Sequence, residues 1–305
     1  MTQQSAPTAV LKTIHVGTAG WSYDDWRGRF YPEKMPARFD HLAYLARYFD
    51  CVEVNASFYR PPDAQAAASW LRRTPEGFTF AFKLHRRFTH ERETPWTPGE
   101  VDTFRRGIEP VREAGRLGAV LVQFPWSFRC DDAALRHVEA IRADFSGLPL
   151  VVEVRHASWT GERAVAFLRE RGLGWCNIDQ PPSRSGVPPT SLLTSPVGYV
   201  RLHGRNREAW FDPKAGRDAR YDYLYRENEL EEWIGRIRDI ARRGEKTFVF
   251  TNNHYRGQAP ANAFQILSRL AGRRVPVPSP LLRAYPFLER VADEGLPPGE
   301  QGTLF

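Results

Sequence analysis

An apolar strand pattern that recurs eight times along the chain restricts its possible folds more than any other feature. The clearest copy is VVEVRH at residues 151–156, which places Glu153 and Arg155 two positions apart within a run of valines. Side chains alternate between the two faces of a strand, so this carboxylate and this guanidinium share one face. Such an apolar run is typical of a parallel strand buried on both faces. A charged group buried there destabilises the fold unless it pairs with an opposite charge, so it is expected to be paired or to serve a function.

Similar apolar runs alternate with segments of helical apolar spacing. The strands are expected to begin near residues 14, 51, 79, 119, 149, 174, 198 and 247. Helices are expected near residues 39–48, 64–73, 99–116, 131–145, 162–171, 229–242 and 261–271. Eight strands, seven of them followed by an expected helix, predict an α/β protein with a single (β/α)8 TIM-like barrel of eight parallel strands. A doubly wound sheet is the alternative, but no GxGxxG fingerprint follows the first strand.

We expect three parts along the chain: a leader at residues 1–13, a barrel domain at residues 14–275 and a proline-rich tail at residues 276–305. The N-terminal segment lacks the apolar stretch of a signal peptide, and no apolar run is as long as a membrane span. Cys51 and Cys176 fall inside expected strands, which is typical of buried thiols in a reducing compartment. These features predict a cytoplasmic protein without a membrane partner.

The C-terminal ends of the strands of such a barrel meet at one mouth, where the active sites of this fold lie. Polar side chains at these strand ends and in the loops after them are therefore the candidate site. The candidates for catalysis are carboxylates and imidazoles, namely Glu53, His85, Glu153, Asp179 and His203. The candidates for substrate binding are Trp21, Tyr23, Asn55, Tyr59, Lys83, Gln123, Arg155, Arg201, Arg205, Asn252, Asn253 and His254.

These residue types permit three kinds of chemistry. Lys83 and the arginines could clamp a phosphate or carboxylate, and the net charge of +7 permits such an anionic ligand without requiring it. Glu153 is the best candidate for a general base, because its strand presents it beside Arg155. The histidines could join the carboxylates around a divalent metal, but the nearby cations and the absence of HxH or HExxH spacing disfavour a metal cofactor. The carboxylates and cations could also form a purely structural ion network.

Seven segments, in this order along the chain, resemble the successive signatures of one family. They are GTAGWSYDDWRGRFYP, VEVNASFYRPP, FKLHRRFTH, LVQFPWSF, EVRHASW, RLHGRN and FTNNH. Together they resemble the YecE-like family, domain of unknown function 72, over about residues 14–270. The resemblance implies a TIM-like barrel with a polar mouth and implies no particular reaction. A second proline usually follows FP in this family, whereas Trp126 stands there in this chain.

The last five residues, QGTLF, suggest a protein partner. Gln301, Leu304 and Phe305 are similar to the QxxLF peptide with which bacterial repair proteins and polymerases bind the sliding clamp. In such a peptide the two apolar side chains fill a pocket while the glutamine forms hydrogen bonds. The alternative is a polar tail that happens to end in two apolar residues.

The sequence thus predicts an enzyme acting on a small anionic or phosphate-bearing ligand at the barrel mouth, with hydrolase or phosphodiesterase-like activity as one form of it. DNA is one candidate source of the phosphate, and the clamp-binding tail would link the protein to DNA repair. Two alternatives stay open, because this fold hosts many chemistries. One is a sugar or small-metabolite isomerase or lyase, and the other is a non-catalytic binding module.

Overall fold

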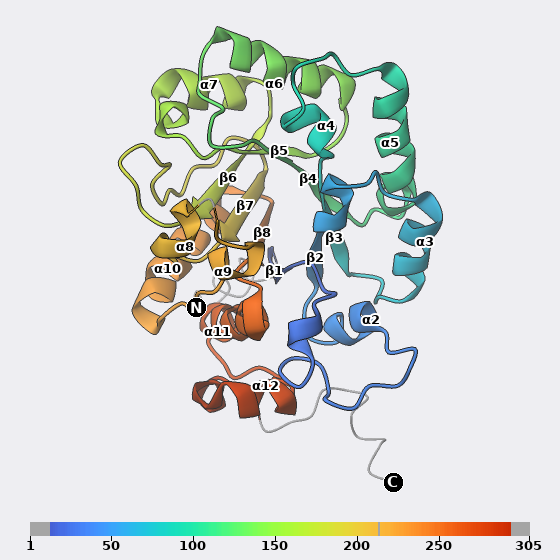
Figure 1. The fold of residues 1–305 in the computed structure, drawn as a ribbon, viewed down its shortest axis with the longest axis vertical. Coiled ribbons are helices and arrows are strands. Elements are labelled where there is room, and N and C mark those ends of the chain that lie inside the picture. The colour runs from blue at the N-terminus through green and yellow to red at the C-terminus, as the bar shows by residue number, and fades with distance from the viewer. Residues whose placement is uncertain (1–12, 213, 294–305) are drawn as a thin grey trace, which may run out of the picture.

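The chain folds into a closed barrel of parallel strands surrounded by helices, which confirms the predicted fold class (Figure 1). The computed structural model describes residues 13–212 and 214–293. Each strand pairs in parallel with the next in sequence, and the last pairs with the first. The strands are β1 (Ile14–Ala19), β2 (Cys51–Val54), β3 (Thr79–Lys83), β4 (Leu117–Gln123), β5 (Leu150–Glu153), β6 (Gly174–Asp179), β7 (Val197–Leu202) and β8 (Lys246–Thr251).

The helices form the outer layer around this barrel (Figure 1). The α-helices are α2 (His41–Leu45), α3 (Ala64–Arg72), α4 (Arg86–Thr89), α5 (Pro98–Glu113), α6 (Asp132–Asp144), α7 (Glu162–Glu170), α8 (Arg207–Phe211), α9 (Arg217–Arg220), α10 (Glu227–Arg243), α11 (Gln258–Ala271) and α12 (Ser279–Ala284). The short 3-10 helices are η1 (Asp24–Trp26), η2 (Asn55–Phe58), η3 (Ala157–Thr160), η4 (Tyr255–Gly257) and η5 (Pro286–Arg290).

Local sequence signals explain where the long helices begin. Thr97 caps α5, because its hydroxyl accepts a hydrogen bond from the Glu100 amide while the Glu100 carboxylate accepts one from the Thr97 amide. Asp131 caps α6 by accepting from the Ala134 amide. Within the described chain no helix lies between β6 and β7, where the four prolines of residues 181–189 disfavour one.

The strand register decides which side chains enter the barrel. Cys176 pairs with Tyr199, and Ile178 pairs with Arg201, so these residues share one face of neighbouring strands. Tyr199 and Arg201 both contact Glu53 on β2, across the barrel from their own strand. The interior face of β6 is therefore formed by its even-numbered residues. One consequence is that the odd-numbered polar residues of β6 face the outer layer.

The narrow interior near β1 requires a residue without a side chain. A Cβ atom on Gly17 would lie 2.1 Å from the carbonyl oxygen of Cys51 on the neighbouring strand. This approach is far below van der Waals contact, so only glycine fits there. Cys51 and Cys176 are buried free thiols, as the sequence predicted.

Residues 276–293 differ from the predicted proline-rich tail. They form α12 and η5, and the side chains of Leu281 and Leu288 are fully buried. The prolines in this segment begin short helices, because proline fits the first helical turn. The barrel unit therefore extends to at least residue 293. Among the helices of the described chain, none has the length and apolar character needed to cross a membrane.

Candidate functional site

A buried ion network lies at the C-terminal end of the barrel interior. Arg201 on β7 donates through Nη2 to Glu53 Oε1 at 2.6 Å and through Nη1 to Glu153 Oε2 at 2.7 Å. Tyr199 donates its hydroxyl to the second oxygen of Glu53 at 2.7 Å. Both carboxylates are fully buried. One guanidinium thus bridges two strands that lie far apart in the sequence, as an arginine fork can do.

Arg155 and His203 complete the surroundings of Glu153. Arg155 Nη2 lies 2.5 Å from Glu153 Oε1, and His203 Nε2 lies 3.3 Å from the same oxygen. Burial alone would raise the pKa of Glu153, but Arg155 and Arg201 hold it well below its usual range. Burial and the nearby Arg155 lower the pKa of His203 to about 3. At neutral pH the carboxylate is therefore ionised and the imidazole is neutral.

Asn252 on the β8 side fixes the orientation of this histidine. Its side-chain amide lies 2.9 Å from His203 Nδ1. With the amide donating, Nδ1 is the acceptor and the ring proton sits on Nε2, toward Glu153. The histidine is fully buried, so it lies beneath the ion network, near Glu153, and does not face solvent.

Lys83 at the end of β3 is the one amine in this region. Its Nζ lies 3.8 Å from the centre of the Phe58 ring. Among the described residues, no Asp or Glu forms an ion pair with it. Burial, together with the nearby Arg201, lowers the pKa of Lys83 to about 7, although Glu153 and Glu53 act in the opposite direction. This lysine is therefore poised to hold or release a proton near neutral pH.

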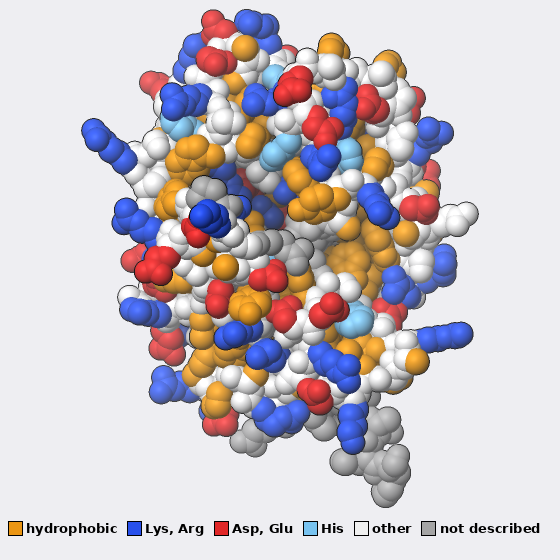
Figure 2. Space-filling model, viewed as in Figure 1, with side chains coloured by type: hydrophobic (Ala, Val, Ile, Leu, Met, Phe, Trp, Pro, Cys, Tyr) orange, Lys and Arg blue, Asp and Glu red, His pale blue; other side chains and the backbone are white. Residues whose placement is uncertain are grey.

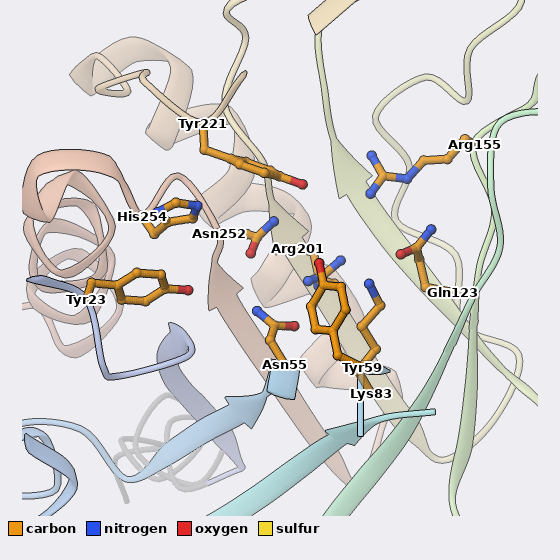
Figure 3. A pocket seen from close by; sticks show the side chains of 10 residues that line it. All are labelled: Tyr23, Asn55, Tyr59, Lys83, Gln123, Arg155, Arg201, Tyr221, Asn252 and His254. Carbon is orange, nitrogen blue, oxygen red and sulfur yellow. The ribbon is translucent and has the colours of Figure 1, made fainter. Parts of the chain in front are cut away.

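A cavity of about 120 Å³ opens above the network (Figure 3). Ten side chains from seven strand ends and loops point toward it. They are Tyr23, Asn55, Tyr59, Lys83, Gln123, Arg155, Arg201, Tyr221, Asn252 and His254. Nine of the ten are residues that the sequence predicted to bind substrate. The space-filling view shows a hollow in this face, with basic side chains inside it and hydrophobic side chains at its border (Figure 2).

Tyr221 is the cavity residue that the prediction missed. It comes from the long insertion between β7 and α10, and its ring lies 5.1 Å from that of His254. His254 in turn stacks on Tyr23 at 4.6 Å. The aromatic content of this insertion is visible in the sequence, but which aromatic residue reaches the mouth depends on the way the insertion packs over it.

Three predicted catalytic residues lie below the cavity instead of lining it. Glu53, Glu153 and His203 have no exposed surface, and the two carboxylates are held by Arg155 and Arg201. The residues do converge at the C-terminal end of the barrel. Within the network these residues hold Arg155 and Arg201, the two arginines that line the cavity, in position.

Asp179, Arg205 and Asn253 do not join the site, which corrects the expected convergence. Asp179 accepts from Arg205 Nε at 2.8 Å and from the Tyr225 hydroxyl at 2.6 Å. The physical reason is the odd-numbered position of Asp179 on β6, which directs it to the outer layer. Arg205 follows Gly204, whose φ is +91°, and its side chain is held by Asp179 and by Glu229 of α10 instead of reaching the cavity.

Asn253 faces the outer layer in the same way. Its side-chain amide donates to the carbonyl oxygen of Tyr223 and to the side-chain oxygen of Asn262, both at 2.8 Å. It therefore ties the end of β8 to the insertion and to α11. Its neighbour Asn252 has the opposite parity and reaches the cavity.

His85 and Trp21 also lie outside the cavity. His85 caps α4, because its Nδ1 accepts from the Arg87 amide at 3.2 Å. Trp21 packs edge-on against Trp70 of α3, with ring centres 5.5 Å apart. Both residues lie two positions beyond a strand end, and their side chains contact α3 and α4 instead of the cavity.

A second cavity of about 240 Å³ adjoins the first and shares Gln123, Arg155 and Tyr221 with it. The other lining residues are Pro125, Trp126, Trp210 and Arg220. Arg155 lies 5.4 Å from the ring centre of Trp210. The buried Nε of Arg220 has no hydrogen-bond partner among the described residues. We call the first the lysine cavity and the second the aromatic cavity.

The sequence permitted a divalent metal cofactor, but the described residues contain no set of side chains arranged to bind one. In residues 13–212 and 214–293, no three His, Cys, Asp or Glu side chains are arranged to hold a metal ion. The oxygens of Glu153 and Glu53 already face arginines or a tyrosine. The predicted clamp-binding residues Gln301, Leu304 and Phe305 lie outside the described residues.

Comparison with known proteins identifies relatives along most of the chain. Residues 15–284 match the family described as protein of unknown function DUF72. The UPF0759 protein YunF of Bacillus subtilis is 31% identical over 270 residues, which cover 84% of this chain and 94% of YunF. The UPF0759 protein YecE of Escherichia coli K12 is 26% identical over 187 residues, 59% of this chain and 64% of YecE.

Solved structures agree with this assignment. A DUF72 family protein of Thermotoga maritima is similar with a TM-score of 0.77 and 35% identity, covering 85% of this chain and 99% of that protein. A DUF72 family protein of Enterococcus faecalis gives a TM-score of 0.75 at 24% identity, covering 86% and 97%, a likeness that concerns the fold. The names of these relatives state no reaction. The predicted resemblance is confirmed, and the chain belongs to the DUF72 family.

Proposed function

We propose that the protein is an enzyme acting on a phosphate-bearing substrate that spans the lysine cavity and the aromatic cavity. One observation carries this proposal. Four cationic side chains, Lys83, Arg155, Arg201 and Arg220, line the two cavities, and none of the described residues that line them is an Asp or Glu. A concave surface of one charge sign concentrates ligands of the opposite charge.

The charge balance of the site supports the same conclusion. Glu53 and Glu153 neutralise Arg201 and Arg155 in the network. Among the described residues, no carboxylate pairs with Lys83, which lies over the Phe58 ring, or with Arg220, whose Nη2 donates to the Asp212 carbonyl oxygen. A phosphate between Arg155 and Arg220 would accept charge-assisted hydrogen bonds from both guanidinium groups. The side-chain amides of Asn55 and Gln123 line the lysine cavity and can hold the uncharged part of the ligand.

The network also argues against the reading in which the glutamates do acid–base work in a sugar isomerase or lyase. A general base must reach the proton that it removes. Glu53 and Glu153 are fully buried and bonded to arginines. Any acid–base chemistry in the lysine cavity therefore falls to Lys83, Tyr59 or His254, which line it.

Calorimetric titration with inorganic phosphate and with a simple phosphomonoester, phenyl phosphate, tests the proposal. The variant Arg220→Met removes a guanidinium from the aromatic cavity, and Arg184→Met removes one from an exposed loop. A lost hydrogen bond to a charged group is worth about 1.5–3 kcal/mol, so Arg220→Met should weaken binding by about 10–100-fold. Arg184→Met should leave affinity unchanged. Equal affinities for all three proteins would overturn the proposal.

A nucleic acid is the second candidate source of the phosphate, and the aromatic cavity favours it. Trp126, Trp210 and Tyr221 line this cavity beside two arginines. Aromatic rings next to cations form stacking surfaces for bases of single strands, worth about 1–3 kcal/mol per base. Titration of labelled single-stranded DNA against wild type and Trp126→Ala, followed by a phosphodiesterase assay, tests this candidate. Unchanged binding in Trp126→Ala would contradict it.

The sliding clamp remains a proposed partner on the strength of the terminal sequence alone. Gln301, Leu304 and Phe305 supply the three side chains of a QxxLF-like peptide. Two buried apolar side chains contribute about 1.5–3 kcal/mol each, so the peptide should bind in the micromolar range or more weakly. Such a tail would tether the barrel near DNA. Titration of purified bacterial clamp with the full chain and with a chain ending at Gly299 tests this, and equal signals would refute it.

A further inference from the structure

We propose that Lys83 is a catalytic residue that forms a covalent imine with the substrate, and that the substrate is a phosphorylated aldehyde or ketone. The proposal rests on the proposed function for its phosphate-binding part. It adds the reacting group, the bond formed and the chemical class of the carbonyl compound. The placement of the Lys83 amine is the observation that supports the proposal.

The amine of Lys83 is directed into the lysine cavity. Figure 3 shows its side chain rising from β3 beside Tyr59, with the guanidinium of Arg201 behind it. The Phe58 ring covers one side of Nζ at 3.8 Å. No carboxylate of the described residues pairs with it. The amine is thus shielded from bulk water but faces the space where a ligand would lie.

The choice of lysine at this position is itself informative. Five of the 43 basic residues in the chain are lysines, and among those in the described part of the chain Lys83 is the one that lines the lysine cavity. The other cations of the two cavities are arginines, which stay charged in proteins. Lysine is the basic side chain that can lose its proton and act as a nucleophile. An arginine would serve a purely electrostatic role at least as well.

The surroundings also favour the neutral amine that an imine requires. Burial and Arg201 lower the pKa of Lys83 to about 7. Near neutral pH the neutral amine is therefore far more populated than for a lysine with an ordinary pKa. A lysine beside another cation in a shielded pocket is a known way to activate this nucleophile.

The proposed step balances without a further reagent. The lone pair of neutral Nζ attacks the carbonyl carbon, and one hydrogen of Nζ passes to the carbonyl oxygen to give a neutral carbinolamine. The hydroxyl group takes up one proton, equal to the one that the ammonium form released, and leaves as water while the nitrogen lone pair forms the C=N bond. Nζ keeps one hydrogen, so the product is a protonated imine with the charge of the original ammonium group, and the cavity stays attractive to the phosphate. Its electron-withdrawing C=N bond then weakens the bonds at the neighbouring carbon.

The two adjoining cavities offer a cationic place for the phosphate and the amine of Lys83 for the carbonyl group. Arg155 lines both, and Arg220 lies in the aromatic cavity. A phosphate held between these arginines places the carbon chain toward the lysine cavity. A small phosphorylated sugar fits this arrangement, because its phosphate and its carbonyl group are separated by a few bonds.

Reductive trapping on the full chain tests the imine. Wild type is incubated with formaldehyde, dihydroxyacetone or dihydroxyacetone phosphate, reduced with cyanoborohydride and analysed by peptide mass mapping. We expect Lys83 to be labelled at pH 7 at least tenfold faster than the exposed Lys34 and Lys246. Lys83→Arg should lose this label and keep the fold. Formaldehyde is small enough to enter the cavity, so labelling of Lys83 no faster than of Lys34 would overturn the proposal.

The phosphorylated probe separates this inference from the proposed function. We expect dihydroxyacetone phosphate to label Lys83 faster than dihydroxyacetone, and Arg220→Met to remove this advantage while formaldehyde labelling is unchanged. Phosphate binding without labelling of Lys83 would refute the imine and leave the proposed function standing. Fast labelling by both ketones, without phosphate binding, would refute the phosphorylated class.

Discussion

Replacing Arg201 with methionine should destabilise the protein strongly, because this guanidinium is shared by two buried carboxylates. Its nitrogens lie 2.6 Å from Glu53 and 2.7 Å from Glu153, and both glutamates are fully buried. Breaking a buried ion pair by removing one partner costs about 3–5 kcal/mol. For a chain of this size, about 2 °C per kcal/mol gives a fall in melting temperature of roughly 6–10 °C.

Two comparisons distinguish this charge effect from a loss of packing. Arg142 pairs with Glu139 on the surface of α6, so Arg142→Met should cost about 0–1 kcal/mol. Adding Glu53→Gln to Arg201→Met removes one uncompensated charge and should restore part of the lost stability. Thermal and urea unfolding measure all four proteins. Equal losses in Arg201→Met and Arg142→Met, or a further loss in the double variant, would refute the argument.

Three further changes test other parts of the structure. The pKa of His203 is lowered to about 3 from 6.5, so the unfolded chain binds more protons than the folded one. The contribution of His203 to the free energy of unfolding is complete above pH 6.5 and is lost as the pH falls toward 3. Urea unfolding should therefore show a smaller loss of stability between pH 7 and pH 5 for His203→Gln than for wild type. Asp179→Asn should lower stability by about 1–3 kcal/mol and leave phosphate affinity unchanged in calorimetry, because its partners Arg205 and Tyr225 lie outside the cavities. Gly17→Ala should lower the melting temperature far more than Gly77→Ala, because a Cβ atom at Gly17 meets the Cys51 carbonyl at 2.1 Å whereas Gly77 has open space.

The strand pattern was sufficient to predict the barrel. Every strand begins within two residues of its expected start, because apolar β-branched runs are a local signal. The long helices α5, α6 and α10 were predicted for the same reason, since apolar spacing and capping residues are local too. The short helices of the loops and the packed segment after residue 275 were not predicted, because their apolar residues find partners far away in the sequence.

The site was predictable to the extent that strand ends define it. Lys83 and Gln123 reach the cavity because they end a strand on the interior face, and Asn55 reaches it from the position directly after β2. Asp179 could not be excluded from sequence, because its parity follows from the pairing of Ile178 with Arg201 on the next strand. Arg220 belongs to an insertion whose path over the mouth depends on tertiary contacts such as that between Asn206 and the Ala219 carbonyl.

The network also explains why we do not propose Glu153 as a general base. An isolated buried carboxylate has a raised pKa and suits proton transfer, but Glu153 lies within reach of Arg155 and Arg201, and these hold its pKa low. Arg201 also acts on Lys83, whose pKa it lowers along with burial. The same guanidinium therefore favours the ionised form of Glu153 and the neutral form of the Lys83 amine. For this reason we place the chemistry of the mouth on β3 instead of β5.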